Sequence, residues 1–233
     1  MPQFAVVLPA AGKSSRFKLQ PRKKPFIELQ SRAVWLRAAD HFQNRPDVAQ
    51  TIVVVSPDDL DWFKTEFAHD IAAMRIDVAV GGAERADSVG NALALVKPEI
   101  DLIAVHDAAR PILASAWIDR VFAAAIRDGA AILATPITST IKRATAGGKV
   151  AETVPRIGLW AAQTPQVFRK QLLIDAYAGR GKMEPTDEAQ LIESFGHPVT
   201  LVEGSPLNIK ITADDDFHFA DILVARGLGQ PST

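Results

Sequence analysis

The sequence contains no cysteine, which excludes disulfide bonds, thiol nucleophiles and cysteine-based zinc sites. It also lacks an apolar run approaching the roughly 20 residues of a membrane span, and Met1 to Phe4 lack the charged and apolar regions of a signal peptide. A formal net charge of −1 creates no overall field that would attract nucleic acid or an anionic membrane. We therefore expect a cytoplasmic protein that binds neither of them and holds any anionic ligand with a local cluster of cations.

The sequence is rich enough in hydrophobic residues, 48% of 233, to bury a sizeable core. Short apolar runs alternate with stretches of helical periodicity. We predict strands over residues 4–8, 51–55, 76–80, 102–105, 130–135 and 199–202. A further strand-like segment, at residues 158–162, is where the alternation of strands and helices resumes after the hairpin described below. We predict helices over residues 31–42, 57–67, 86–96, 116–126, 170–177, 187–195 and 214–226.

This alternation with short connections predicts an α/β fold with a Rossmann-like, mostly parallel, doubly wound sheet. The alternation of strands and helices stops after Pro136. There, two short, polar and β-prone segments, residues 140–143 and 149–153, flank Gly147-Gly148. This is the chemistry of a hairpin, and a polar hairpin with little core of its own should project from the body. We predict one domain over residues 1–233 with a protruding β-arm at about 137–158.

The first predicted strand leads into a loop of small residues, Pro9 to Gly12, followed by Lys13-Ser14-Ser15-Arg16. Small residues let backbone N–H groups approach an anion closely. Five cations, Arg16, Lys18, Arg22, Lys23 and Lys24, lie within nine positions and suit a triphosphate. The loop has neither the Walker A spacing nor the three glycines of a dinucleotide-binding motif. Taken singly, Lys18, Arg22 and Lys23 are better explained as a solvated basic loop.

Two further motifs follow predicted strands and therefore lie at the same edge of the sheet. Gly81-Gly82 could let backbone atoms meet a base edge, with Ser88 as a donor, although a simple helix cap at Asp87 or Ser88 explains the pattern equally well. Asp107 stands where a carboxylate could bind Mg²⁺, and Arg110 could bind a phosphate or merely brace Asp107.

Other polar residues have ordinary structural explanations as well. His106 is better read as a packed histidine than as a catalyst, and Lys210, between Ile209 and Ile211, could be solvated. The acidic residues after Thr186 read first as a helix cap.

Together, these motifs resemble the 2-C-methyl-D-erythritol 4-phosphate cytidylyltransferase family of the non-mevalonate isoprenoid pathway. The most specific match is the string His-Asp-Ala-Ala-Arg-Pro at residues 106–111. Further matches, in order over essentially the whole chain, are at residues 9–12, 81–82, 84–89, 140–143, 158–160, 164–166, 186–188, 202–204 and 208–210. The sequence departs from the family pattern in the first loop, where Ser14 replaces a glycine and the segment to Lys24 is one residue longer.

The resemblance implies a Rossmann-like homodimer, built through the β-arm, that transfers CMP from CTP to a polyol phosphate with Mg²⁺ as cofactor. It implies roles for the following residues: Ala10, Ala11, Gly12, Gly82 and Ser88 for CTP; Asp107 for Mg²⁺; Arg16, Lys24 and Lys210 as catalytic cations; and Arg110, Thr140, Arg156, Thr164 and Thr186 for the polyol phosphate. The sequence leaves open whether Lys23 or Lys24 is the catalytic lysine.

Three alternatives remain at this point. The first is a ribitol-5-phosphate cytidylyltransferase, which shares the main motifs. The second is an NAD-binding oxidoreductase, which the missing glycines and the basic loop disfavour. The third is a non-catalytic nucleotide-binding regulator, which would not need the cations.

Overall fold

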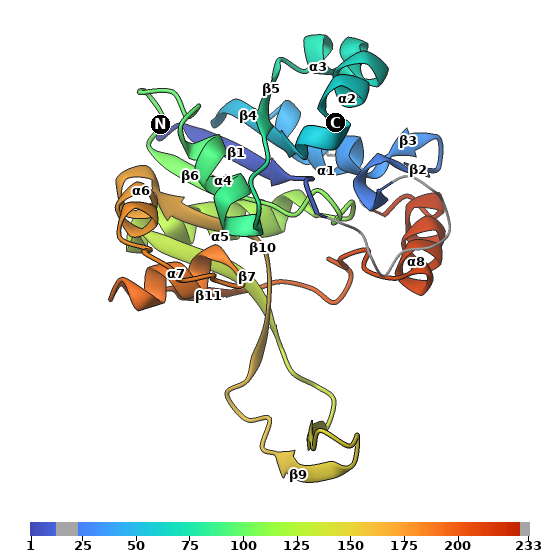
Figure 1. The fold of residues 1–233 in the computed structure, drawn as a ribbon, viewed down its shortest axis with the longest axis vertical. Coiled ribbons are helices and arrows are strands. Elements are labelled where there is room, and N and C mark those ends of the chain that lie inside the picture. Colours follow the sequence, from blue (N-terminus) through green and yellow to red (C-terminus); the bar gives the residue numbers. More distant parts are fainter. Residues whose placement is uncertain (13–22, 229–233) are drawn as a thin grey trace.

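A seven-stranded sheet organises the molecule, with strand order β11-β7-β10-β6-β1-β4-β5 (Figure 1). The computed structural model describes residues 1–12 and 23–228. The strands are β1 (Phe4–Pro9), β4 (Val48–Val55), β5 (Ile76–Val80), β6 (Leu102–Val105), β7 (Ala130–Pro136), β10 (Trp160–Arg169) and β11 (Thr200–Glu203). Within this sheet β10 is antiparallel to both neighbours, and the other pairings are parallel, as the predicted fold class requires.

Helices cover both faces of the sheet because successive residues of a strand point to opposite sides. In β1, Phe4, Val6 and Leu8 enter one core, while Ala5 and Val7 enter the other. The first core is covered by α1 (Val34–Gln43), α2 (Leu60–Glu66), α3 (Ala68–Ala73) and α5 (Ser115–Asp128). The second is covered by α4 (Arg85–Leu93), α6 (Lys170–Ala178) and α7 (Glu188–Ser194).

A small third core joins the C-terminal helix α8 (Asp214–Ala225) to the short strand β2 (Glu28–Leu29), which pairs with β3 (Arg32–Ala33). Two 3-10 turns, η1 (Lys24–Phe26) and η2 (Pro57–Asp59), precede α1 and α2. In the described part of the chain, no helix is long and apolar enough to cross a membrane.

The hairpin of β8 (Ile141–Ala144) and β9 (Val150–Val154) projects far from the body, at the end of the long ribbons that continue β7 and β10 (Figure 1). Gly148 has φ +74° in its turn, a left-handed conformation that favours glycine. The segment from 137 to 159 contributes no residue to the buried hydrophobic core. The hairpin therefore depends on the body, or on another chain, for its order.

The structure differs from the sequence-based assignments in three places. Residues 32–33, at the start of the predicted helix over 31–42, form β3, and α1 begins at Val34. The predicted helix over 57–67 is divided into η2 and α2, and Phe67 lies between α2 and α3. Ser56 is the N-cap residue of η2, but its hydroxyl donates to Asp59 Oδ2 at 2.7 Å and does not accept from the backbone. The strand expected near 158–162 is a ten-residue strand reaching Arg169. Its polar residues Gln163, Thr164 and Gln166 are buried, which the hydrophobic pattern could not reveal.

Candidate active site

A cavity of about 500 Å³ lies at the carboxyl ends of β1, β4, β5 and β6. The sheet order reverses at β1, since the chain passes from β1 to β4 and β5 and then returns to β6 on the other side. Such switch points are where open α/β sheets bind ligands. Eight predicted site residues line this cavity together: Ala10, Ala11, Gly12, Lys24, Gly82, Ser88, Asp107 and Lys210.

The backbone at the cavity wall is shaped by two glycines that bring the first and second loops together. A Cβ at Gly81 would stand 2.7 Å from the Cβ of Ala11, and one at Gly82 would stand 2.4 Å from the Cβ of Asp87. Neither position therefore accepts a side chain without movement of the backbone. The wall of the cavity is close-packed backbone, which can read a flat ligand edge.

Ser88 braces this wall from behind. Its hydroxyl accepts from the Gly82 N–H at 3.0 Å and donates to the Glu84 carbonyl at 3.0 Å. Glu84, with Asp87 as its capping-box partner, caps α4, so neither Asp87 nor Ser88 is the N-cap residue. The hydroxyl of Ser88 thereby fixes the loop that precedes α4.

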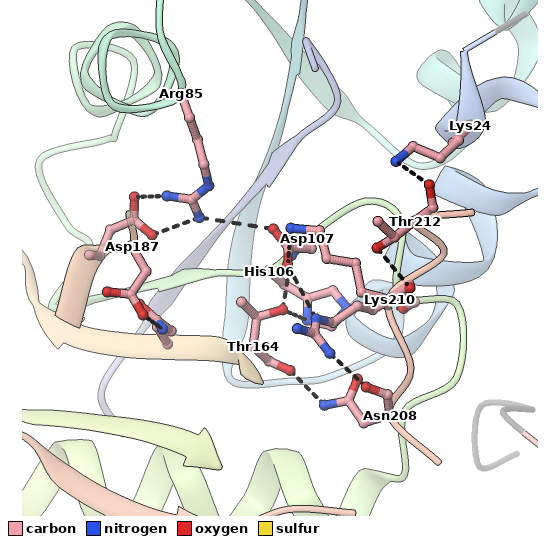
Figure 2. Close-up of polar contacts among 12 residues, drawn as sticks. Lys24, Arg85, His106, Asp107, Thr164, Asp187, Asn208, Lys210 and Thr212 are labelled. Carbon is pink, nitrogen blue, oxygen red and sulfur yellow. Dashed lines mark hydrogen bonds and ion pairs between the residues drawn. The ribbon is translucent and has the colours of Figure 1, made fainter. Parts of the chain in front are cut away.

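Asp107 follows β6 and stands among three cations (Figure 2). Its Oδ2 lies 3.0 Å from Lys210 Nζ and 3.2 Å from Arg110 Nε, and its Oδ1 lies 3.9 Å from Arg85 Nη2. Burial would raise the pKa of Asp107, but Lys210, Arg110 and Arg85 outweigh burial and hold that pKa well below its usual range. The carboxylate is therefore ionised at neutral pH.

The backbone of Asp107 is held by a buried network. The Asp107 N–H donates to Thr164 Oγ1 at 3.0 Å, and this hydroxyl lies 3.0 Å from His106 Nδ1. His106 Nε2 lies 3.1 Å from the Arg110 carbonyl. Burial lowers the pKa of His106 to about 3, so the ring is neutral, with Nε2 as donor and Nδ1 as acceptor in this pattern. The structure thus agrees with a structural rather than a catalytic histidine.

The residues assigned to the polyol phosphate lie outside this cavity in the described chain. Thr164 is buried in the network beneath Asp107, and Arg110 donates to the Asn208 carbonyl at 2.6 Å as well as to Asp107. Thr186 is exposed just before α7. Thr140 and Arg156 lie on the arm, where Arg156 donates to the Thr138 carbonyl. Their roles stay predictions.

The two adjacent lysines both line the cavity but make different contacts. Lys23 Nζ lies 2.6 Å from Asp59 Oδ2 and donates to Ser56 Oγ at 2.8 Å. Lys24 Nζ donates to the Thr212 carbonyl at 3.3 Å (Figure 2). The contacts of the two lysines therefore differ, and the assignment of Lys24 rather than Lys23 to the ligand stays a prediction. The predicted residue Arg16 lies outside the described residues.

The sequence analysis missed a buried ion pair at the cavity wall. Arg85 donates to both oxygens of Glu188, at 2.7 and 2.9 Å, and Tyr177 donates to Glu188 Oε1 at 3.1 Å. The side chain of Glu188 is fully buried, although its sequence position suggested only an acidic residue in the first turn of a helix. The only local signal for this ion pair in the sequence is the string Glu-Arg-Ala-Asp-Ser at residues 84–88, which lies close after Gly81-Gly82.

A Rossmann-like sheet with close-packed backbone, cations and the buried carboxylate of Asp107 at its switch point is typical of enzymes that handle nucleotide phosphates. The comparisons with known proteins make this specific. The model of the family "2-C-methyl-D-erythritol 4-phosphate cytidylyltransferase" matches residues 4–226. The chain belongs to this family and is a nucleotidyltransferase. An NAD-binding oxidoreductase and a non-catalytic regulator are thereby excluded.

Individual relatives agree with the family match. A 2-C-methyl-D-erythritol 4-phosphate cytidylyltransferase of Rhodopirellula baltica is 43% identical over 94% of each chain, and one of Bacillus velezensis is 38% identical over 97% of this chain and 98% of the relative. The crystal structure of a 4-diphosphocytidyl-2C-methyl-D-erythritol synthase from Anaerococcus prevotii has a TM-score of 0.81 at 28% identity, with 97% of each chain covered. The cytidylyltransferase structure from Thermus thermophilus has a TM-score of 0.77 at 32% identity, covering 97% of this chain and all of that one.

Proposed function

We propose that this chain transfers CMP from CTP to 2-C-methyl-D-erythritol 4-phosphate in the cytoplasm, giving 4-diphosphocytidyl-2-C-methyl-D-erythritol and pyrophosphate. The observation that carries the proposal is the cavity, in which two backbone loops, three lysines and Asp107 converge from segments far apart in the sequence. Such a set suits one small base and one triphosphate better than a long dinucleotide.

The nucleotide half of the reaction would use the described cavity directly. Backbone groups of Ala10, Ala11, Gly12 and Gly82, the last held in place by Ser88, would contact cytidine and its phosphates. Close-packed backbone favours a small pyrimidine edge over a purine. We therefore expect CTP to be used in preference to ATP.

The chemical step needs no covalent intermediate with the protein. An oxygen of the substrate phosphate attacks the α-phosphorus of CTP, and the bond from that phosphorus to the bridging oxygen breaks as pyrophosphate leaves. The protein must align the two phosphates and stabilise the extra negative charge of the transition state. Lys24, Lys210 and Arg16 would supply that charge, and no general base is needed because the phosphate is already a nucleophile.

Asp107 fits a Mg²⁺ site of the kind completed by substrate. Mg²⁺ typically uses one or two carboxylates together with phosphate oxygens and water. Asp107 is ionised and borders the cavity, and the described residues hold no group of three or more His, Cys, Asp or Glu side chains that could bind a metal alone. When bound, Mg²⁺ would neutralise phosphate charge and orient the triphosphate.

The second half of the site would come from a homodimer. Ile157 is 95% exposed and Val150 64% exposed on the arm, so apolar surface remains for a partner to cover. Pairing about a two-fold axis would order the arm and bring Thr140 and Arg156 to the neighbour's site. There they would meet the polyol phosphate together with Arg110, Thr164 and Thr186.

Pyrophosphate release tests this proposal. The purified chain is incubated with CTP and 2-C-methyl-D-erythritol 4-phosphate, with Mg²⁺ or with a chelator, and parallel reactions contain ribitol 5-phosphate or ATP. We expect turnover only with CTP, the erythritol phosphate and Mg²⁺. Faster turnover of ribitol 5-phosphate would make ribitol 5-phosphate the preferred substrate. Equal turnover of ATP and CTP would contradict the proposal that the backbone at the cavity wall selects cytosine.

A further inference from the structure

The Arg85–Glu188 pair lies beside the cavity and has no role in the steps above. Arg85 is the first residue of α4, and Glu188 is the first residue of α7, 103 residues further along the chain. Glu188 is held by both Nη atoms of Arg85 and by the hydroxyl of Tyr177. Burial opposes the charge of Arg85, but Glu188 outweighs it and keeps the pKa of Arg85 above its ordinary value.

The surrounding contacts keep this arrangement rigid. The ring of Tyr177 lies against α4 at Gly90, where a Cβ would stand 3.6 Å from the ring. Arg180, which follows α6, pairs with Asp87 of α4 at 2.5 Å. Two ion pairs and one aromatic contact therefore fix α4 against α6 and α7, so the position of the Arg85 guanidinium is set by α7 as well as by its own helix.

The two oxygens of Asp107 differ in a way that depends on this position. Lys210 Nζ and Arg110 Nε lie 3.0 and 3.2 Å from Oδ2, whereas the contact of Arg85 is with Oδ1, at 3.9 Å. That distance exceeds the 2.7–3.2 Å of a hydrogen bond by nearly an ångström. Within residues 1–12 and 23–228, no hydrogen bond to Oδ1 is found, and Asp107 lines the cavity.

We propose that Glu188 is a positioning residue that holds Arg85 back from Asp107, so that Oδ1 stays open to Mg²⁺ in the nucleotide complex. Without the negative charge of Glu188, the guanidinium would move about an ångström and donate to Oδ1. The cation would then compete with the metal for the same oxygen. This inference rests on the proposed use of Mg²⁺ with CTP.

The test measures CTP affinity by calorimetry as Mg²⁺ is varied, in the wild type, in Glu188→Gln and in the double variant Glu188→Gln/Arg85→Gln. Glutamine keeps the shape of Glu188 but not its charge. We expect Glu188→Gln to need on the order of ten times more Mg²⁺ to strengthen CTP binding, as is typical when a residue behind a metal ligand is changed. The double variant removes the competing cation, so its Mg²⁺ requirement should return to within about threefold of the wild type.

The outcomes separate positioning from simple bracing. If Glu188 only stabilises the fold, Glu188→Gln will have a lower melting temperature but an unchanged Mg²⁺ requirement, and the second substitution will not change that requirement. That result overturns the inference. If the wild type itself binds CTP equally well without Mg²⁺, the proposed function fails instead. If Glu188→Gln does not fold, Tyr177→Phe takes its place, because it removes one hydrogen bond to Glu188. Tyr177→Phe should raise the Mg²⁺ requirement about two- to threefold. An unchanged Mg²⁺ requirement in Tyr177→Phe would overturn the inference.

Discussion

The body and the arm of this molecule are stabilised in different ways. In the body, both faces of the sheet are buried under helices, and the ion pairs at the cavity involve side chains such as Asp107 and Arg110, which are 10% and 11% exposed. On the arm, the pair of Arg143 with Glu152 has side chains 65% and 55% exposed. Exposed pairs of this kind contribute little to stability, whereas partly buried pairs hold their partners in place.

This difference suggests a division of labour in the active site. Under the proposed function, the body holds Ala10 to Gly12, Gly82 and Asp107 at one cavity within a single chain. The arm has no such support, since residues 137 to 159 add nothing to the buried hydrophobic core. Under the proposed function, Thr140 and Arg156 would act where another surface orders them, and a second copy of the chain would supply that surface.

The largest effect should follow from Asp107→Asn in the body. We expect activity to fall by about a hundred- to a thousandfold and to respond less to Mg²⁺, because the ionised ligand is lost. Three cations lose their shared partner, so stability should also fall, by about 1–3 kcal/mol. Steady-state kinetics at several Mg²⁺ concentrations, together with thermal unfolding, measure both. A loss of stability with unchanged Mg²⁺ dependence would mean that Asp107 only braces the strand end.

Lys24→Ala should come next, with kcat reduced by roughly a hundredfold, which corresponds to about 3 kcal/mol of transition-state stabilisation. Lys23→Ala is the matched control, because Lys23 lies in the same cavity but pairs with Asp59. The control should reduce kcat much less. If Lys23→Ala has the larger effect on kcat, the catalytic lysine is one position earlier than assigned.

A smaller effect concerns the pH dependence of stability in the body. His41 is buried and lies 3.0 Å from the Pro111 carbonyl, and burial lowers its pKa. Its stabilising contribution is therefore complete above the unfolded pKa of about 6.5 and is lost as the pH falls toward the folded pKa. His41→Gln should reduce the slope of unfolding free energy against pH below 6.5 by up to about 1.4 kcal/mol per unit.

Urea unfolding from pH 7 to pH 5 measures this slope, with His69→Gln on the exposed surface of α3 as the control. An unchanged slope in His41→Gln would show that this histidine already takes up its proton in the folded state.

The same contrast explains what the sequence could predict. Strands β5 and β6 have the predicted bounds. In β6 every residue is buried and apolar, as expected for a strand buried on both faces. The polar part of β10 could not be found in this way, since Gln163, Thr164 and Gln166 are buried for their hydrogen bonds rather than for their hydrophobicity.

Within the site, residues that follow strands were predictable and long-range pairs were not. Asp107 lies two residues after the end of β6, so its place at the sheet edge follows from the position of the strand. Its contact with Lys210 and the pairing of Arg85 with Glu188 join segments about a hundred residues apart. No local spacing encodes such pairs, and only the folded chain brings them together.

The division of labour between body and arm is tested most directly by mixing two inactive variants, Lys24→Ala and Arg156→Ala, under conditions that exchange subunits. In a mixed dimer, the Arg156→Ala chain keeps its own Lys24 and receives an intact Arg156 from its partner. Half of the dimers are then mixed and half of their sites are whole, so activity should recover to about a quarter of the wild-type value. If Arg156 acts within its own chain, no site in the mixture is complete, and activity will stay at the level of the separate variants.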